Sequence, residues 1–439
     1  MMVNLDDNIS LASLNNPTPE IVQYYSDIPE IEDIDNRGYK IVRPLFAHSD
    51  FPSYVDIKRV RENEIDYKKP FIYSVYLHHN DALSAKHIYK LPEKVLQAAR
   101  EGICKIILDN SLEGDKVYDF YTQLHFACAK YNIPVKQLYY ITNSLVAKTL
   151  YQKWKEDNPT LVNDTGLVIP PSDKDLNVLP FMFNVHDIPR LVRSRHLPGD
   201  VSIQDEIKYK EENLSRIKTF LKVNRTGRAE RDMFMLHINK YNMYDKFKIS
   251  YPEFFNRQHL PKNLFPELVE ESNIESLKKK VPFDIDKSDE ENHGPPGVGK
   301  GSFNADLPFN PIHYRDTFIS VVMCAFPFTR DACHLHSSTF NPMWCGHPVI
   351  QFGPYRHLEL LKRKGFRTFS PWWDEDYDNI YFGWDRFKRI LEIVDSLAKK
   401  TPEEMLEMYK DMHVVLEHNI QVMKDYNSKS VLRKFISYE

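Results

Sequence analysis

The chain has 439 residues, of which 42% are hydrophobic and 27% are charged, and its formal net charge is −4. These values are ordinary for a globular protein, and a chain of this length is expected to form two domains. It contains no apolar run near the roughly 20 residues that cross a bilayer, and its polar start lacks the apolar segment of a secretory signal. We therefore expect no membrane span and a cytoplasmic location. The five cysteines contain no CxxC pair, which argues against a disulfide framework.

The first half alternates strand and helix patterns after an irregular arm of about 65 residues. Predicted strands cover 71–77, 105–108, 137–141 and 177–183, and predicted helices cover 91–101 and 118–131. This order predicts a parallel sheet with helices on its faces, in which ligands meet the loops at the carboxyl ends of the strands. Those loops are 78–81, 109–113 and 142–144.

The second half repeats this alternation after a polar, charged stretch at 196–212, where we place a domain boundary. Predicted strands cover 219–223, 319–324 and 348–352, and predicted helices cover 230–242, 356–364, 386–399 and the region from 402 onward. A charged stretch rich in Pro and Gly, 278–310, is predicted to be a long surface loop. The predicted parts are domains 1–205 and 206–425 and a tail, 426–439, that returns to the first domain.

The strongest functional pattern is Asn224-Arg225-Thr226-Gly227-Arg228-Ala229-Glu230-Arg231, which joins a predicted strand to a predicted helix. A helix start favours an anion through its N–H groups and its dipole, and arginine forks add bidentate bonds to phosphate oxygens. Three arginines spaced three apart could converge on one diphosphate. The alternative is a solvated helix start whose arginines pair with local acids.

With this stretch the chain resembles a family of phage and bacterial glycosyltransferase-like proteins, distantly related to fucosyltransferases, whose second domain opens on Asn-Arg-x-x-Arg-x-x-Arg. Further matches are 338–342, 345–350, 353–354, 365–369 and 374–378 in the second half, and 91–93, 101–102, 109–114 and 133–134 in the first. The resemblance implies the GT-B fold, an α/β architecture in which two Rossmann-like domains with parallel sheets face a central cleft.

The resemblance also implies a sugar transfer from a nucleotide-diphosphate donor, a UDP- or GDP-sugar, to a hydroxyl, with no cofactor or metal required. The implied donor-binding residues are Asn224, Arg225, Arg228, Arg231, Ser338, Thr339, Phe340 and His347. The candidates for the base that takes the acceptor proton are Glu113, Asp109, Asp81 and His79. Glu113 comes first by resemblance, although each of the four could instead cap a helix or a loop.

The chain departs from the family at two places. The family carries Thr-Glu-Lys where this chain has His336-Ser337-Ser338, and a Glu near Cys324 is absent. Either the donor is an unusual sugar held by hydroxyl and imidazole groups, or the chain binds without catalysing. The intact arginines favour the unusual donor. The rival function is a non-catalytic protein that binds a nucleotide sugar or a nucleic acid.

The acceptor is left open between saccharides, proteins and hydroxymethylated bases of phage DNA. A bias toward Lys, Asn, Tyr and Ile suggests an AT-rich genome, and for a viral genome the location would be the host cytoplasm. A role in DNA modification needs a basic surface, and segments 58–61, 190–195 and 362–364 are available for one. The oligomeric state is also left open.

Three other patterns are set aside. Residues 294–302 meet most of a Walker A motif, but a charged segment precedes them and Gly301 occupies the position that needs Ser or Thr. The cysteines and histidines between 333 and 347 could surround zinc, but their spacing matches no zinc motif. The aromatic run 369–373 is expected to be core.

Overall fold

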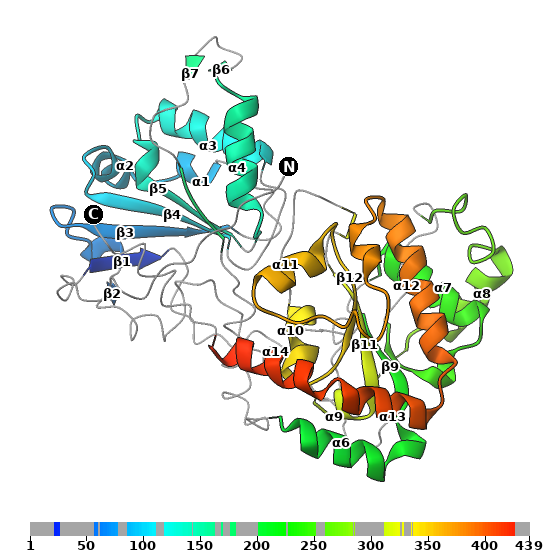
Figure 1. Ribbon diagram of the computed structural model, residues 1–439. Helices are drawn as coiled ribbons and strands as arrows, with labels where there is room; N and C mark the ends of the chain where they lie inside the picture. The colour runs from blue at the N-terminus through cyan, green and yellow to red at the C-terminus, as the bar shows by residue number, and fades with distance from the viewer. Residues whose placement is uncertain are drawn as a thin grey trace. The chain divides into compact units, whose positions relative to one another are not determined.

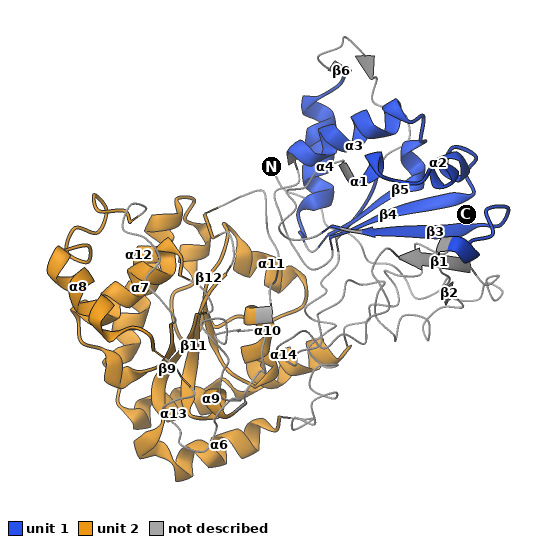
Figure 2. Cartoon of the chain, turned by 180° about the vertical axis from the view of Figure 1, so that it is seen from behind, with its two compact units in different colours: residues 1–183, 331–335, 427–439 blue, residues 184–330, 336–426 orange. Residues whose placement is uncertain are grey.

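The computed structural model of the chain describes residues 22–26, 57–59, 62–77, 86–110, 118–142, 144–162, 168–169, 176–180, 201–224, 227–251, 260–283, 285, 311–324, 327–328, 335 and 337–425. Two compact units form: unit 1 takes residues 1–183, 331–335 and 427–439, and unit 2 takes 184–330 and 336–426 (Figure 2). The predicted tail, 426–439, lies outside the described residues. Within the described ranges, no helix is long and apolar enough to cross a membrane.

Unit 1 contains a parallel six-stranded sheet of order β2-β1-β3-β4-β5-β8 and a separate antiparallel pair, β6-β7. The strands are β1 (Val22–Ser26), β2 (Ile57–Arg59), β3 (Phe71–Tyr76), β4 (Cys104–Asn110), β5 (Leu138–Thr142), β6 (Leu161–Val162), β7 (Val168–Ile169) and β8 (Asn177–Pro180). The helices are α1 (Lys86–Tyr89), α2 (Glu93–Arg100), α3 (Tyr118–Lys130) and α4 (Ala147–Asp157).

Strands β3, β4, β5 and β8 lie next to one another in the sheet in the same order as in the chain. Because crossovers between parallel strands are right-handed, the intervening helices α2, α3 and α4 fall on the same face, as Figure 1 shows. All seven residues of β4 are buried, which is typical of a central parallel strand. The prediction of an irregular arm over the first 65 residues was wrong in part, because β1 and β2 join the sheet. These strands have five and three residues and are too short to leave a periodic signal in the sequence.

Unit 2 contains a parallel four-stranded sheet of order β10-β9-β11-β12. The strands are β9 (Lys218–Val223), β10 (Phe247–Ser250), β11 (Thr317–Met323) and β12 (Val349–Phe352). The helices are α6 (Ile203–Glu212), α7 (Ala229–Lys240), α8 (Glu271–Lys280), α9 (Pro311–Arg315), α10 (Ser337–Trp344), α11 (His357–Arg363), α12 (Gly383–Ala398), α13 (Pro402–Asp411) and α14 (His413–Asp425).

The winding of this second sheet reverses in its middle. The chain steps from β9 to β10 in one direction and from β11 to β12 in the other. The right-handed crossover rule therefore places α7 and α10 on opposite faces, as Figure 1 shows. We call the region outside the carboxyl ends of β9 and β11 the switch point. In doubly wound sheets, ligands bind at such a point.

The predicted α/β class with two Rossmann-like halves and parallel sheets is confirmed, while the central cleft stays a prediction. The polar stretch at 196–212 was predicted as a boundary, but its second half is helix α6. Ser202 accepts a hydrogen bond from the backbone N of Asp205 at 3.3 Å, and α6 buries Ile203 and Lys210. The predicted loop at 278–310 begins inside α8, and its stretch 286–310 lies outside the described residues.

One buried cation ties α6 to the sheet of unit 2. Lys210 is 1% exposed, and its Nζ donates to the carbonyl oxygens of Tyr314, Arg315 and Thr317 at 3.2, 2.8 and 2.6 Å. The ammonium group has three hydrogens, so the three carbonyls use all of them, and two of the carbonyls belong to the end of α9. Burial lowers the pKa of Lys210 to about 7, although nearby Glu206 and Asp316 favour its charged form.

Replacing this lysine tests how much the anchor contributes. Lys210→Met leaves three buried carbonyl oxygens without their donor, so the free energy of unfolding should fall by about 3 kcal/mol in a urea titration. Lys208 is exposed on the same helix, and Lys208→Met should change stability by no more than about 0.5 kcal/mol. Equal stability of the two variants would show that the anchor is dispensable.

Candidate functional site

The predicted arginine-rich stretch follows β9 and leads into α7. Asn224 continues the strand by one residue, since its backbone N donates to Ser250 O at 2.8 Å. Arg228 is the N-cap of α7, with extended φ and ψ of −153° and 156°, and its side chain makes no capping hydrogen bond. The N-cap residue therefore does not cover the first N–H groups of α7, and the positive end of the helix dipole lies at the same place.

Asn224 carries an unusual buried amide at this position. The residue is 1% exposed, and neither its Nδ2 nor its Oδ1 has a hydrogen-bond partner among the described residues. A buried polar group without a partner costs about 1–3 kcal/mol, so such groups are uncommon unless a bound group completes them. The amide offers two N–H donors and one acceptor oxygen, on a residue four positions before the N-cap of α7.

Two of the three predicted arginines are found at the switch point. Arg228 is half-buried, and its side chain makes no ion pair or hydrogen bond within the part of the chain that the structure describes. Arg231 lies in the first turn of α7, and its charge lowers the pKa of both Lys222 and Cys324, which places its guanidinium near the ends of β9 and β11. Arg225 lies outside the described residues.

A buried lysine adds a third cation that the sequence analysis missed. Lys222 is fully buried in β9, and its Nζ donates to Val321 O of the neighbouring strand at 3.3 Å. Burial lowers its pKa well below the ordinary value and the charge of Arg231 lowers it further, while Glu230 and Cys324 act in the opposite direction. The cations are thus partly opposed by the buried Glu230 carboxylate. A lysine within an apolar strand pattern was the signal available in the sequence.

Neutral side chains form the other side of the switch point, where β11 ends. Gln351 Nε2 donates to Cys324 Sγ at 3.2 Å and to the hydroxyl of Thr339, which in turn bonds to Cys324. His357 Nε2 lies 3.8 Å from the same sulfur. Burial raises the pKa of Cys324 to about 11 and lowers that of His357 to about 4, so both are neutral near pH 7. Thr339 is fully buried, and its hydroxyl is used inside the protein.

The predicted hydroxyl-bearing turn at 338–342 is part of helix α10. Ser338 is half-buried in the first turn of this helix, which begins at the same edge of the sheet. Phe340 is fully buried and packs on Phe366, with ring centroids 5.5 Å apart. Ser338 is therefore near this edge, whereas the Phe340 ring belongs to the core of unit 2.

His347 lies at the opposite edge of the sheet. Its Nδ1 is 2.8 Å from Ser320 Oγ and its Nε2 is 2.9 Å from Thr317 O, both on the amino-terminal half of β11. That edge is roughly 20 Å from the switch point along the strand. Burial lowers the pKa of His347 well below its ordinary value, so it is a neutral core histidine. The structure does not bring it together with Asn224 and Arg228, which corrects the expectation from the Gly-His-Pro match.

Of the predicted bases, the structure describes one. Asp109 is 1% exposed and lies within β4, not in the loop after it, and its backbone O accepts from Leu77 N at 3.0 Å. His79, Asp81 and Glu113 lie outside the described residues.

Helix α11 also begins at the carboxyl edge of unit 2, but an acidic side chain covers its start. Asp378 Oδ2 accepts from Glu359 N at 3.0 Å, and the same carboxylate bonds to the amides of His357 and Leu358. Burial raises the pKa of Asp378 to about 6, although the hydrogen bonds from these amides favour the ionised form and lower the pKa. This helix start is therefore closed to an anion, in contrast to that of α7.

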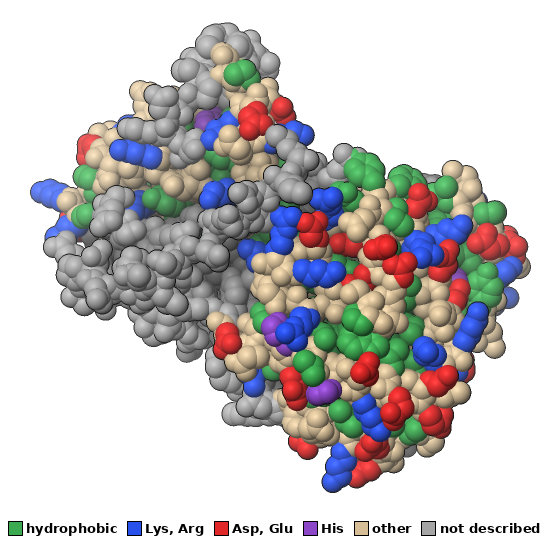
Figure 3. All heavy atoms as spheres, in the orientation of Figure 1, with side chains coloured by type: hydrophobic (Ala, Val, Ile, Leu, Met, Phe, Trp, Pro, Cys, Tyr) green, Lys and Arg blue, Asp and Glu red, His purple; other side chains and the backbone are tan. Residues whose placement is uncertain are grey.

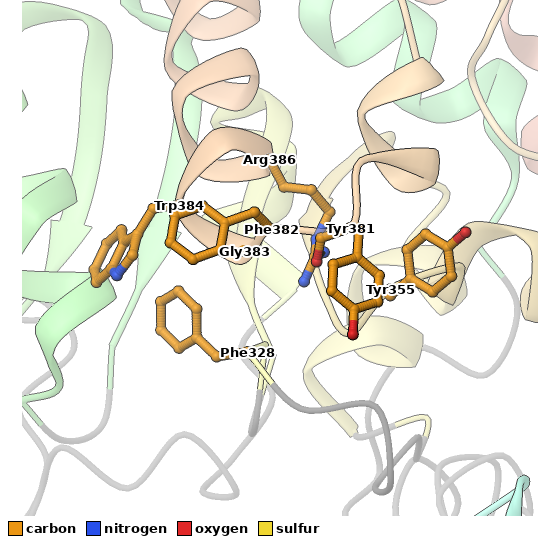
Figure 4. Close-up of a pocket in the computed structure, with 7 residues that line it drawn as sticks. All are labelled: Phe328, Tyr355, Tyr381, Phe382, Gly383, Trp384 and Arg386. Carbon is orange, nitrogen blue, oxygen red and sulfur yellow. The ribbon is translucent and has the colours of Figure 1, made fainter. Parts of the chain in front are cut away.

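An open pocket of about 320 Å³ lies beyond the ends of β11 and β12. Figure 4 shows its lining, which consists of Gly383, Arg386 and the five aromatic rings of Phe328, Tyr355, Tyr381, Phe382 and Trp384. We call it the aromatic pocket. The sequence analysis missed it and considered the aromatic run at 369–373 instead, where Phe369 and Trp373 are core as predicted. The signal available was the density of aromatic residues at 381–384.

Within the described ranges, no group of three or more His, Cys, Asp or Glu side chains could hold a metal ion. Of the possible zinc ligands, Cys345 and His347 are buried, and residues 333, 334 and 336 lie outside the described residues. The Walker-like segment, 294–302, lies outside them as well.

Comparison with known proteins gives remote structural likenesses. No protein-family model matches the chain, and the curated proteins give no significant match. An E. coli trehalose-6-phosphate structure bound with UDP-2-fluoro glucose matches with a TM-score of 0.40 and 9% identity, over 84% of this chain and 74% of that one. A trehalose 6-phosphate synthase from Burkholderia multivorans matches with a TM-score of 0.38 and 8% identity, over 84% of this chain and 70% of that one. A Rickettsia africae glycosyltransferase matches with a TM-score of 0.29 and 10% identity, over 87% of each chain. Likenesses this remote carry no conclusion about what the chain does.

The cap on α11 gives a pH dependence that can be measured. The pKa of Asp378 is raised from 3.8 to about 6, so the stability this group contributes is complete below about pH 4 and is lost as pH rises through 6. Asp378→Asn keeps an acceptor oxygen but cannot titrate. The free energy of unfolding of the variant should therefore decline less than that of the wild type between pH 4 and 6 in urea titrations.

The exposed neighbour Asp376 provides the matched control for this measurement. Asp376→Asn should keep the wild-type pH profile, since that side chain is in water. Identical profiles for the wild type and Asp378→Asn would contradict the raised pKa.

Proposed function

We propose that the chain is a glycosyltransferase that takes its sugar from a nucleoside-diphosphate donor and binds the diphosphate at the switch point of unit 2. One observation carries the proposal: the buried amide of Asn224, which has no partner among the described residues, lies four residues before Arg228, the N-cap residue of α7, and Arg231 lies in the first turn of that helix. Backbone amides, guanidinium groups and a neutral amide are together suited to an anion with many oxygens. A monovalent anion would not need so many donors.

The same groups suit the chemistry of transfer. When the bond between the sugar and the diphosphate breaks, negative charge develops on the departing oxygen, and fixed donors that face it lower the barrier. Arg228, Arg231 and the first amides of α7 would supply at that oxygen what a metal ion supplies in other transferases. Arg231 is held beside Lys222 in a buried setting, where its charge is less screened by water than at an open surface.

The base that activates the acceptor is proposed to come from unit 1. Glu113, Asp81 and His79 keep this role as predictions. Asp109 is less suited, because its carboxylate is 1% exposed and an acceptor hydroxyl would have to reach into the sheet to contact it.

For the acceptor we propose a saccharide hydroxyl, because the described residues offer little support for DNA. Lys362 Nζ lies 3.5 Å from a Glu375 oxygen, and Arg363 pairs with Glu359, so the basic segment at 362–364 is partly neutralised. On the face of unit 2 that Figure 3 shows, Lys and Arg are interspersed with Asp and Glu. DNA backbones favour continuous basic surfaces instead.

Removing one guanidinium tests the diphosphate site directly. Arg228→Ala should weaken the binding of UDP, GDP and inorganic pyrophosphate by about tenfold or more in isothermal titration, since bonds to charged groups contribute about 1.5–3 kcal/mol. The exposed Arg367, also in unit 2, gives the control variant Arg367→Ala, which should bind as the wild type does.

Two outcomes would contradict the proposal in different ways. Unchanged pyrophosphate affinity in Arg228→Ala would remove the diphosphate from the start of α7. Tight binding of UDP-sugars and GDP-sugars, with no release of nucleoside diphosphate in the presence of saccharide acceptors or water, would instead support a binding protein without transferase activity. That second possibility is favoured by the replacement of Glu and Lys at 336–338 and by the internal use of the Thr339 hydroxyl.

Lys222 makes the binding of the anion depend on pH. Its pKa is lowered in the free chain, chiefly by burial and then by Arg231, and a bound diphosphate would favour the charged form and raise the pKa again. Binding should therefore take up a proton, and pyrophosphate affinity should gain as pH falls through the range in which Lys222 becomes protonated. In Lys222→Met the gain in affinity that comes from protonation of the lysine should be lost. The pH dependence that comes from the titration of pyrophosphate itself should be the same for the variant and the wild type.

Isothermal titration in two buffers with different ionisation enthalpies gives the number of protons taken up. Equal proton uptake by the wild type and Lys222→Met would show that Lys222 does not sense the anion.

A further inference from the structure

The aromatic pocket carries more exposed ring surface than folding alone explains. Phe328, Tyr381 and Phe382 are 43%, 49% and 51% exposed and lie together at its rim. Large apolar side chains that gather in a hollow at the surface usually mark a place where another group packs. The described residues that line the pocket all belong to unit 2.

The walls of the pocket are tightly built. Phe328 and Trp384 contact each other with ring centroids 4.6 Å apart, and Tyr355 and Tyr381 do so at 5.6 Å. Figure 4 shows the first pair with Phe382 on one side and the two tyrosines on the other, with Arg386 between them. A Cβ atom on Gly383 would lie 2.4 Å from a ring carbon of Phe328, so this close approach requires glycine.

Arg386 forms hydrogen bonds to both sides of the pocket, and one of its N–H groups has no partner among the described residues. It is 2% exposed, and its Nη1 donates to the carbonyls of Ile380 and Tyr381 at 2.6 and 3.0 Å, while Nη2 donates to Pro327 O at 2.5 Å. These bonds join the segment before α12 to the turn after β11. The Nε of Arg386 is buried and has no hydrogen-bond partner among the described residues. Arg386 is one of the residues that line the pocket, so this N–H is the group in the lining that an acceptor atom of a ligand would satisfy.

The chemistry of the lining favours a flat heteroaromatic ring over a sugar. Among the described lining residues, no side chain carries a carboxylate, amide, aliphatic hydroxyl or ammonium group, and the polar side-chain groups are the Arg386 guanidinium and two tyrosine hydroxyls. A pyranose carries a hydroxyl on most of its carbons, and burying these without partners is costly. A nucleobase has two apolar faces for stacking and a few acceptor atoms at its edge. A volume of about 320 Å³ is at the small end for ligand pockets.

The position of the pocket matches the proposed diphosphate site. It lies outside the ends of β11 and β12, and the switch point lies outside the ends of β9 and β11, so the two share β11. Neighbouring strands are about 5 Å apart, so the two places follow each other along the same edge of the sheet. In a nucleoside diphosphate a ribose joins the base to the diphosphate, which suits two neighbouring places of this kind.

We propose that the aromatic pocket holds the base of the donor nucleotide, stacked between the rings of Phe382 and Tyr381, with Arg386 Nε donating to an acceptor atom of the base. The inference rests on the proposed function, since it assigns the second half of the same donor site. It adds that the base selects the donor through this pocket, while Arg228 and the start of α7 bind the charge that all donors have in common.

The test compares two kinds of diphosphate. UDP, GDP and ADP carry a ribose and a base, and inorganic pyrophosphate carries neither. For the nucleotide that binds most tightly, Phe382→Ala and Tyr381→Ala should each weaken binding by about tenfold, with unchanged affinity for pyrophosphate. Both rings are about half exposed, so their removal should leave the fold intact. Tyr241→Ala removes a ring that is 53% exposed at the end of α7 and should change neither affinity.

The opposite pattern would overturn the inference alone. If Phe382→Ala and Tyr381→Ala leave nucleotide affinity within about twofold of the wild type while Arg228→Ala weakens it, the diphosphate site stands and the base lies elsewhere.

If neither nucleotides nor pyrophosphate bind, the proposed function fails, and free nucleosides then test the pocket by itself. Uridine, guanosine and adenosine should quench the fluorescence of Trp384, and Trp384→Phe should remove that quenching. No quenching by any nucleoside would overturn the assignment of a base.

Discussion

The site depends on one constraint, which is the reversal of winding between β9 and β11. Because right-handed crossovers send α7 and α10 to opposite faces of the sheet, neither helix covers the carboxyl ends of the two central strands. The start of α7, whose N-cap residue Arg228 makes no side-chain cap, lies at this edge, where the residues near the end of β9 approach those near the end of β11.

Charge at this point is balanced locally and not by the protein as a whole. The net charge of −4 gives no overall attraction for an anion, yet Lys222 and Arg231 lie close together, with the buried Glu230 as a partial counter-charge, and Arg228 is the N-cap residue of α7. Burial disfavours the charged form of Lys222, so the free chain holds less positive charge there than the residue count suggests. An anion would restore that charge, which couples recognition to a proton.

The sequence predicted the strands well where burial is continuous, as in β4 and β11, because an apolar run needs no partner to be recognised. It predicted Arg228 and Arg231 because a strand, a turn and a helix adjoin in the chain. It could not place His347, since a Gly-His-Pro match does not say which edge of the sheet the turn occupies. The aromatic pocket joins residues from 328 to 386, and only the fold brings these segments together.

The central claim is that unit 2 binds a nucleoside diphosphate at the switch point, and the crystal structure of the chain with UDP or GDP tests it most directly. The account predicts phosphate oxygens within hydrogen-bond distance of the first amides of α7, the guanidinium of Arg228 and the amide of Asn224. A complex with the phosphates at any other place, such as around Lys300, would contradict it.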